Sequence, residues 1–343
     1  MTEQQFTRGP AMRDVAAAAG VSAQTVSRVL SDHPNVQEST RARVMAAVEQ
    51  LGYRRNYTAR ALVTGRSRTI GLVTLATNNY SRSSLALGIE NGARDAGYTV
   101  NSVTSTLSTK AMTKAVSRLV FQGVDGIILA APLLDASDTV RKLTQRIPTI
   151  NTDGSAAWGD ALVGVDQDIS AVLATKHLLD LGHSTVWHVA GPAEWSDAAS
   201  RLNSWRRTLQ EAGREVPPEL HGDWSPESGY HNGLILGRMP EVTAIFVASD
   251  EMAFGVLRAL DELGRRVPGD ISVVGIDDID LAAFSNPPLT TVRQSFEDTG
   301  RRAVQRLVTL IANPKVGGAP ELLAPTLVVR GSTAAPPVGR GTA

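Results

Sequence analysis

The sequence predicts a small N-terminal all-α headpiece of the helix-turn-helix type, followed by an α/β core of two lobes with parallel, doubly wound sheets. Two observations carry this prediction. Residues 11–34, AMRDVAAAAGVSAQTVSRVLSDHP, hold two short helical patterns that are separated by Gly-Val-Ser. From Ile70 onward, short runs rich in β-branched residues alternate with helical stretches, an order that builds parallel sheets covered by helices.

The composition is typical of a globular protein of two or three domains. The chain has 343 residues, 42% of them hydrophobic, and no cysteine. Disulfides, a thiol nucleophile and cysteine-ligated metals are therefore excluded. No apolar run reaches the roughly 18 to 20 residues that a membrane span requires, and MTEQQFTRGPAMRD lacks the apolar segment of a secretory signal. These features predict a cytoplasmic protein with no membrane partner.

Charge is distributed unevenly along the chain. The formal net charge is zero, yet residues 1–68 hold ten arginines and five acidic residues, so the remainder carries the compensating negative charge. No acidic residue lies between Glu49 and Glu90, a window that contains six arginines. A basic head on an acidic body favours a polyanionic partner for the head. On charge alone, a solvated charged surface explains the bias equally well.

The spacing of apolar residues, together with two glycines and one serine, predicts three helices in the headpiece. Gly20 can adopt the left-handed conformation without a side-chain clash and so closes the first helix. Ser22 is suited to cap a second helix from Ala23 to about Ser31, and Gly52 ends a third from about Glu38 to Leu51. The expected buried positions are Met12, Val15, Ala16 and Ala19, then Val26, Val29 and Leu30, then Val44, Ala47, Val48 and Leu51.

The outward face of the second helix carries side chains that can read DNA. These are Ala23, Gln24, Thr25, Ser27, Arg28 and Ser31. Glutamine can pair with adenine and arginine with guanine, and the alanine methyl group suits the thymine methyl group. Together with the basic head, this face predicts binding to double-stranded DNA. A plain amphipathic helix is the structural alternative.

The core is expected to form two lobes, because about 270 residues exceed what one sheet holds comfortably. Helices are expected at Ser84–Ala96, Ala111–Gln122 and Asp168–Leu181. The expected strands lie in TIGLVTL, YTVNSV, VDGIILA, IPTINT, ALVGVD, TVWHVAG, TAIFVAS and ISVVGIDD. Ligands of such sheets bind beyond the carboxyl ends of the strands.

Polar residues that suit a sugar follow these strands. They are Asp153, Arg201, Ser249, Asp250, Asp277 and Asp278. Carboxylates accept hydrogen bonds from hydroxyl groups, arginine donates them, and tryptophan faces pack against the apolar faces of a sugar ring. Each acid alone is explained as a strand-end cap or a solvated loop residue. Their recurrence at successive strand ends favours a ligand site.

Two long segments carry a resemblance to a known family. DVAAAAGVSAQTVSRVL and LGYRRNYTARALVTGRSRTIGLV resemble the start of the lactose-repressor family of bacterial transcription regulators. The motifs GDWSPESG, ASDEMAFG, DISVVGIDD and PPLTTVRQSF are, within that family, most similar to those of the lactose repressor itself. The resemblance runs from about residue 11 to 330 and implies a periplasmic-binding-protein-like core. It also implies a cytoplasmic, nucleoid-associated repressor of sugar-utilisation genes that is not an enzyme and needs no cofactor or metal.

For the headpiece, the resemblance implies direct contacts with operator DNA. Base contacts fall on Ala23, Gln24 and Arg28. Phosphate contacts fall on Arg13, Ser22, Thr25, Ser27, Ser31, Asn35 and Thr40. Residues 56–64 would form a hinge that becomes helical on the operator, with Asn56, Ala59 and Leu62 at the minor groove. Arg55 replaces a proline common in the family, and a buried linker role for Leu62 is the alternative.

For the core, the resemblance implies a saccharide between the lobes. Its contacts fall on Asp153, Trp195, Asp197, Arg201, Trp224, Ser249, Asp277, Gln294 and Phe296. Trp224 lies in a motif associated with galactosides, so a β-galactoside or a plant oligosaccharide is expected to release the repressor. Ser249 stands where the family usually has asparagine. Trp195 is unusual at its place, where it can form either a pocket wall or part of the core.

The expected domain boundaries combine these observations. Disordered tails are expected at 1–10 and 333–343, a helix-turn-helix domain at 11–54 and a hinge at 55–67. The lobe that follows the hinge (the N-lobe) comprises 68–166 and 297–323, and the second lobe (the C-lobe) comprises 167–296 and 324–332. The C-terminal end lacks the leucine heptads that would form a tetramer, so a homodimer is expected.

Three other functions remain open at this stage. A family regulator could use a co-repressor such as a purine. A solute-binding transport protein would share the two lobes but would need an export signal and no basic headpiece. A sugar-acting enzyme could use Asp277 and Asp278, although G-x-S-x-G, H-E-x-x-H and Walker A patterns are absent and no two histidines are spaced to bind a metal from one helix face.

Overall fold

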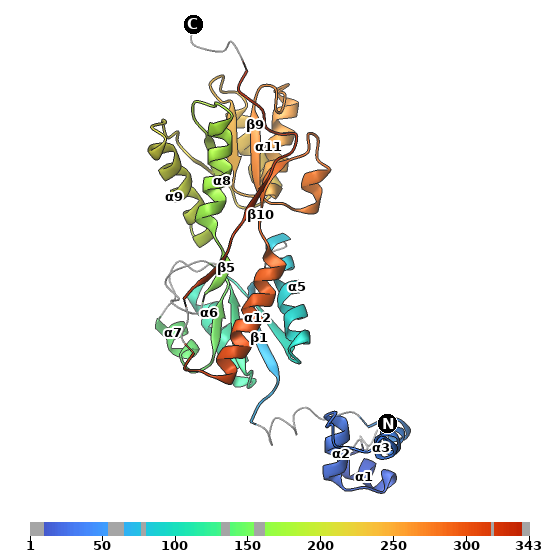
Figure 1. Ribbon diagram of the computed structural model, residues 1–343. Helices are drawn as coiled ribbons and strands as arrows, with labels where there is room; N and C mark the ends of the chain where they lie inside the picture. Colours follow the sequence, from blue (N-terminus) through green and yellow to red (C-terminus); the bar gives the residue numbers. More distant parts are fainter. Residues whose placement is uncertain are drawn as a thin grey trace, which may run out of the picture. The chain divides into compact units, whose positions relative to one another are not determined.

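The computed structural model describes residues 10–53, 65–76, 80–131, 138–153, 162–316 and 319–337. The chain divides into two compact units, Met1–Ser67 and Arg68–Ala343, here called the head and the core (Figure 1). The expected hinge positions Asn56, Ala59 and Leu62 lie outside the described residues. Within the described ranges, no helix is long and apolar enough to cross a membrane.

The head is the expected helix-turn-helix unit. It contains α1 (Met12–Ala19), α2 (Ala23–Leu30) and α3 (Glu38–Leu51). Gly20 has φ 63°, and its left-handed conformation ends α1 as predicted. The Ser22 hydroxyl accepts a hydrogen bond from the backbone N–H of Thr25 and caps α2. Val15, Val26 and Val44, one from each helix, are completely buried, so the predicted apolar faces form the core of this unit.

The N-lobe is a parallel sheet with helices on both faces. The strand order is β2-β1-β3-β4. Helices α5 and α12 cover one face and α6 and α7 cover the other (Figure 1). The strands are β1 (Thr69–Leu75), β2 (Thr99–Ser105), β3 (Gly126–Ala130) and β4 (Thr149–Asn151), and the helices are α5 (Tyr80–Asp95), α6 (Thr109–Phe121), α7 (Asp138–Thr144) and α12 (Phe296–Ala312).

The C-lobe repeats this architecture with a larger sheet. The strand order is β12-β10-β9-β8-β6-β7, and only β12 runs antiparallel to its neighbour among the pairs described. Helices α8 and α9 pack on one face, and α10 and α11 on the other. The strands are β6 (Trp187–Ala190), β7 (Leu220–His221), β8 (Ala244–Val247), β9 (Ser272–Asp277), β10 (Thr290–Arg293) and β12 (Thr326–Val328), and the helices are α8 (Gln167–Asp180), α9 (Ser196–Glu211), α10 (Pro226–Leu236), α11 (Asp250–Glu262) and the 3-10 turn η2 (Asp280–Ala283).

The chain passes between the lobes after β5 (Val163–Val165), between β10 and α12, and between β11 (Glu321–Leu323) and β12. β5 and β11 pair in parallel as a two-stranded sheet beside these crossings. After the second crossing, α12 packs closely against α5. A Cβ atom at Gly88 would lie 2.1 Å from the backbone oxygen of Glu297, so only glycine permits this approach.

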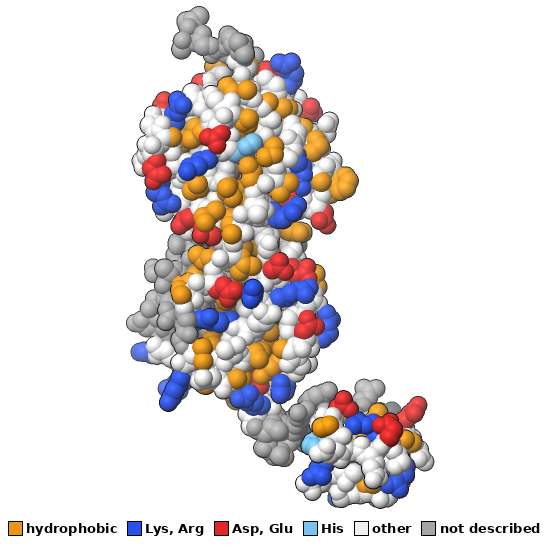
Figure 2. Space-filling view, viewed as in Figure 1, with side chains coloured by type: hydrophobic (Ala, Val, Ile, Leu, Met, Phe, Trp, Pro, Cys, Tyr) orange, Lys and Arg blue, Asp and Glu red, His pale blue; other side chains and the backbone are white. Residues whose placement is uncertain are grey.

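The outer surface of the core mixes charges of both signs. On the face that Figure 2 shows, Lys and Arg side chains are interspersed with Asp and Glu side chains over both lobes. Such mixing is the common surface pattern of globular proteins and gives no sign of a nucleic-acid footprint on this face.

The C-terminal segment is ordered further than composition predicts. Disorder was expected from Thr333 onward, but the Thr333 hydroxyl lies 3.0 Å from Nε2 of His177. The backbone N–H of Ala334 donates to the hydroxyl of Ser272 at 3.0 Å, and its oxygen lies 3.0 Å from Nε2 of His183. This expectation was wrong for these residues, because polar groups of the C-lobe, among them the buried His183 and Ser272, fix a segment whose own composition favours disorder.

The C-lobe core contains a histidine that must stay neutral. His188 is completely buried, its ring stacks on Phe246 with 4.3 Å between centroids, and Nδ1 donates to the Phe246 backbone oxygen at 2.9 Å. Nε2 has no hydrogen-bond partner in the described part of the chain. Burial lowers the pKa of His188 to about 3.

We therefore expect His188 to make the core sensitive to acid. The unfolded chain gains a proton on this residue as pH falls below about 6.5, whereas the folded chain does not, so the free energy of unfolding decreases between pH 6.5 and 3. A His188→Phe variant keeps a flat ring without a titrating nitrogen. Urea unfolding at pH 7 and pH 5 should show a smaller acid loss in the variant, and equal losses would contradict this assignment.

Candidate functional site

A pocket with a cavity volume of about 40 Å³ lies between the two lobes of the core. Its residues come from α5, the ends of β4 and β5, and the starts of α8, α9, α11 and α12, with Trp224 and Asp277 from loops and strand ends of the C-lobe. The lining residues are Ser81, Arg82, Leu85, Thr152, Asp153, Val165, Gln167, Trp195, Asp197, Arg201, Trp224, Ser249, Glu251, Asp277, Phe296 and Thr299.

The structure brings most of the predicted effector residues together at this pocket. Those that line it are Asp153, Trp195, Asp197, Arg201, Trp224, Ser249, Asp277 and Phe296. Gln294 is not among the lining residues. It is buried, and its side-chain amide exchanges hydrogen bonds of 3.1 and 3.2 Å with that of Gln167, which does line the pocket.

Two other strand-end acids point elsewhere. Asp250 accepts hydrogen bonds from the Thr291 hydroxyl at 2.6 Å and from the Ile279 backbone N–H at 3.0 Å, so it ties the start of α11 to the loop after β9. Asp278 forms ion pairs of 2.6 Å with Arg293 and Arg330. Asp277 thus lines the pocket while the carboxylate of Asp278 is held by two arginines, which is unfavourable for a shared catalytic role.

Sequence reasoning missed Arg82, the third residue of α5. Its side chain is only 7% exposed. Nη1 donates to both carboxylate oxygens of Asp153 at 2.6 and 2.7 Å, and Nη2 lies 3.8 Å from Asp197 in the other lobe. Its position after the first strand of a parallel sheet was the signal available in the sequence.

Arg201, on α9 in the C-lobe, is also buried, and its guanidinium group is hydrogen-bonded to a different set of partners. Its Nε donates to Oε1 of Gln167 at 2.8 Å, and Nη1 donates to the backbone oxygen of Ala248. The buried guanidinium group is thus bound by a side-chain amide and a main-chain carbonyl, which fix it toward the pocket.

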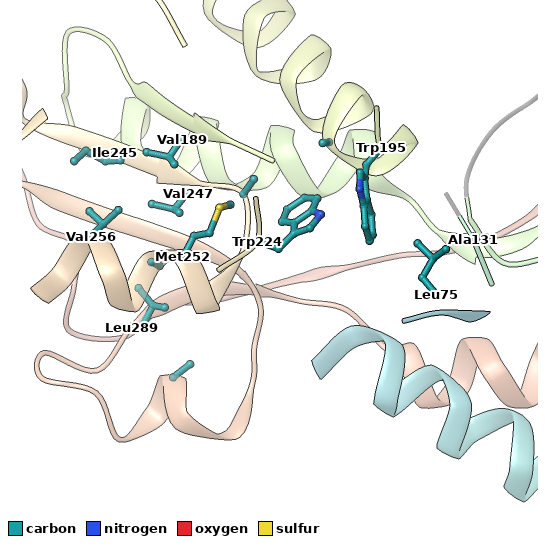
Figure 3. Packing of buried hydrophobic residues seen from close by; sticks show 14 of the residues in the cluster. Leu75, Ala131, Val189, Trp195, Trp224, Ile245, Val247, Met252, Val256 and Leu289 are labelled. Carbon is teal, nitrogen blue, oxygen red and sulfur yellow. The ribbon is translucent and has the colours of Figure 1, made fainter. Parts of the chain in front are cut away.

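The two tryptophans form an aromatic wall between these arginines. Figure 3 shows Trp195 and Trp224 side by side, next to the buried apolar residues of the C-lobe. Their ring centroids lie 5.6 Å apart at 70°, an edge-to-face arrangement. The guanidinium carbon of Arg82 lies 5.4 Å from the Trp195 ring and that of Arg201 lies 5.6 Å from the Trp224 ring. Trp195 therefore both lines the pocket and packs against the core.

Three polar atoms of the pocket are buried without a hydrogen-bond partner in the described part of the chain. They are Nε of Arg82, Nε1 of Trp224 and Oδ1 of Asp277. Buried polar groups are almost always paired in folded proteins, so a cluster of unpaired ones marks a place for a polar ligand. Two donors and one carboxylate oxygen of the lining residues are thus unsatisfied, and these are the types of group that pair with hydroxyl groups.

The backbone at the C-lobe side of the pocket is strained. Trp224, Asp277 and Asp278 have φ values of 74°, 121° and 55°, which side chains rarely adopt. Such positions cluster at ligand sites, where the surrounding structure holds them in place. The Trp224 ring also lies against Gly191, where an added Cβ atom would come within 2.2 Å of the indole.

Burial dominates the electrostatics of the carboxylates. It raises the pKa of Asp153 to about 6, although the adjacent Arg82 lowers it. It raises the pKa of Asp277 to about 7, against the lowering effect of Arg201, and it also raises the pKa of Glu251. Perturbed acids gathered in one pocket are typical of functional sites.

In the head, the predicted recognition face of α2 is exposed. Ala23, Gln24 and Arg28 are exposed, while Val26 and Val29 on the opposite face are buried. The predicted phosphate positions Arg13, Ser22, Ser31 and Asn35 are exposed, and Thr25, Ser27 and Thr40 are half-buried. None of the three predicted base contacts has an apolar side chain larger than that of alanine.

Comparisons with known proteins cover both units. Residues 11–56 match bacterial regulatory proteins of the lacI family, and residues 175–333 match the periplasmic binding protein-like domain. The chain is 33% identical to the ribose operon repressor of Escherichia coli (strain K12), over 94% of this chain and 99% of that repressor.

Solved structures give the same result. The lac repressor dimer bound to operator and the anti-inducer ONPF has a TM-score of 0.88 and 34% identity, covering 96% of this chain and 100% of that one. The complex of the transcriptional regulator CelR with cellobiose has a TM-score of 0.71 and 30% identity, covering 94% of this chain and 99% of that one. Both similarities extend over the head and the core.

The raised pKa of Asp277 predicts a cost in stability. The unfolded carboxyl ionises near 3.8, so the folded chain becomes less stable as pH rises from about 4 to about 7, where the buried group must also ionise. Asp277→Asn should raise the free energy of unfolding at pH 8 by on the order of 2 to 4 kcal/mol. Urea denaturation should show this gain shrinking toward pH 5, and a less stable variant at pH 8 would refute the prediction.

Proposed function

Because the chain belongs to the lacI family of bacterial regulatory proteins, we propose that it is a dimeric transcriptional repressor that a saccharide releases from operator DNA. The observation that carries this proposal is the pocket between the lobes, whose unpaired donors and carboxylate oxygen match the hydroxyl groups of a sugar. Membership rests on similarity that spans nearly the whole chain, including the head.

The exposed face of α2 supports the DNA-binding part of the proposal. In it, Gln24 and Arg28 contact bases and Ala23 contacts a thymine methyl group, while the hydroxyl groups around them bind phosphates. Two heads are needed to bind a near-palindromic operator, so the active form is a homodimer. The hinge positions Asn56, Ala59 and Leu62 would become ordered on the operator, and Leu62 would enter the minor groove.

The residues of the pocket are consistent with a saccharide effector but do not distinguish one saccharide from another. The two relatives with nearly equal identity, at 33 and 34%, are named for ribose and lactose, and the CelR structure holds cellobiose. We favour a β-galactoside or a plant oligosaccharide, because the paired Trp195 and Trp224 rings provide an extended aromatic wall. A purine co-repressor would instead strengthen operator binding, so the sign of the response distinguishes the two.

Effector and operator must affect each other reciprocally. If occupying the pocket shifts the lobes toward an arrangement that disfavours DNA binding, the DNA-bound protein binds the effector more weakly by the same factor. Arg82 and Asp197, which lie 3.8 Å apart across the lobes, are contacts that a change in lobe arrangement would alter.

Arg28→Ala tests the proposed base contact. The substitution should cost roughly 1 to 3 kcal/mol of operator affinity and relax specificity at one base pair, because a base-edge contact is lost. Arg13→Ala, at a proposed phosphate position, should weaken binding to all DNA sequences alike. It should also reduce the slope of log affinity against log salt concentration by about one. Mobility-shift titrations at two salt concentrations measure both, and identical behaviour of the two variants would contradict the assignment.

Arg201→Ala tests the proposed pocket. The substitution should abolish the response of the operator complex to a saccharide while leaving operator affinity unchanged, because Arg201 lines the pocket and lies outside the head. Arg207→Ala, an exposed residue on the same helix, is the matched control. A panel of mono- and disaccharides is screened first by thermal shift. If Arg201→Ala still responds normally, the pocket is not the effector site.

A further inference from the structure

The pocket contains more carboxylates than cations: Asp153 and Asp277 are buried, and Asp197 and Glu251 are half-buried. Asp153, Asp197, Glu251 and Asp277 line it together with Arg82 and Arg201, within the described part of the chain. If all six groups are ionised, the acids outnumber the cations, and the surplus faces the space that a ligand would enter. The net charge of the pocket is therefore negative and disfavours an anionic ligand, although the pocket contains two arginines.

The guanidinium group of Arg82 is already bound by the protein. Nη1 holds both oxygens of Asp153 at 2.6 and 2.7 Å, Nη2 faces Asp197 at 3.8 Å, and the plane lies over the Trp195 ring. Nε is buried and has no hydrogen-bond partner among the described residues. Two parallel N–H donors on one edge of a guanidinium group hold a phosphate or carboxylate strongly. On each edge of the Arg82 guanidinium group, at least one nitrogen already faces a carboxylate of the protein.

Arg201 is similarly bound. Nε donates to Gln167 and Nη1 to the backbone oxygen of Ala248, so each edge of this group also includes an occupied nitrogen. Its guanidinium carbon lies over the Trp224 ring, and its charge lowers the pKa of Asp277. An anion held by two parallel donors would have to displace a protein acceptor of Arg201, or bind Arg82 directly beside the Asp197 carboxylate. The first loses a hydrogen bond of a buried group, and the second brings two negative charges together.

We propose that the pocket selects uncharged saccharides and rejects sugar phosphates and uronic acids, and that Asp153 sets this selectivity by occupying Arg82. The inference rests on the proposed function and narrows the class of effector. Neutral hydroxyl groups use the unpaired Nε of Arg82, Nε1 of Trp224 and Oδ1 of Asp277, and they leave the ion pair between Arg82 and Asp153 intact.

The first experiment compares matched sugars on the intact chain. The pairs are galactose with galacturonate, glucose with glucose 6-phosphate, and cellobiose with its 6′-phosphate, each measured by thermal shift and then by calorimetry at pH 8. We expect the neutral member of a binding pair to bind at least about tenfold more tightly. An anionic member that binds equally or more tightly would overturn the proposal.

The second experiment changes the partners of Arg82. Asp153→Asn removes the carboxylate with little change of shape and frees the guanidinium group, so the preference for the neutral member should fall about tenfold. Asp197→Asn, which frees Nη2, should shift the preference in the same direction to a smaller extent. Arg82→Gln should not improve binding of the anionic member. The control is Asp261→Asn, an exposed carboxylate outside this pocket, which should leave the preference unchanged.

A structural role for Asp153 alone would weaken both members of a pair equally, and that result would reject the selectivity mechanism. If no sugar of either charge binds while operator binding persists, the inference is rejected and the repressor role stands. If neutral sugars bind selectively and no operator is bound, the selectivity stands and the repressor role is rejected.

Discussion

The arrangement of side chains in the pocket is governed by one constraint: a buried charged group needs hydrogen-bond or ion-pair partners. Moving a guanidinium or carboxylate group out of water costs several kcal/mol unless hydrogen bonds and opposite charges compensate. Arg82 and Arg201 are 7% and 4% exposed, so every nitrogen that the protein itself satisfies narrows what a ligand can contact. Asp153 meets this requirement for Arg82, and Gln167 and the Ala248 carbonyl meet it for Arg201. The few atoms left unpaired define the polar contacts that remain for an effector.

These compensating contacts also join the lobes. Arg82 belongs to α5 of the N-lobe, yet it contacts Asp197 and Trp195 of the C-lobe, and the backbone N–H of Tyr80 at the start of α5 donates to Glu251 of α11 at 3.2 Å. Helix α5 is in turn fixed to α12 at Gly88, where the backbones approach too closely for any side chain. A ligand that alters the contacts of Arg82 therefore acts on a closely packed pair of helices that lies at the junction of the lobes.

The head could be predicted from the sequence almost completely, whereas the core could be predicted only in outline. The caps at Gly20 and Ser22 and the apolar spacing of three short helices are local features, and the structure confirms them. Strands β1 to β6, β8 and β9 were also recognised from their β-branched runs. The strands β7, β10, β11 and β12 were missed, because their pairing with distant partners and not a distinct apolar run defines them. The order of Thr333 and Ala334 likewise comes from distant polar groups.

The site shows where reasoning from strand ends reaches its limit. Asp153, Asp250, Asp277 and Asp278 look equivalent in the sequence, but only Asp153 and Asp277 line the pocket. Positive φ values at Asp277 and Asp278 accompany the divergence of two adjacent carboxylates, and no composition rule anticipates them. Arg82 was missed because it lies on the helix after β1 rather than directly at a strand end. A single fold can serve many effectors, so the identity of the effector follows from such individual side chains. Overall identity cannot supply it, since it is nearly equal for repressors named for different sugars.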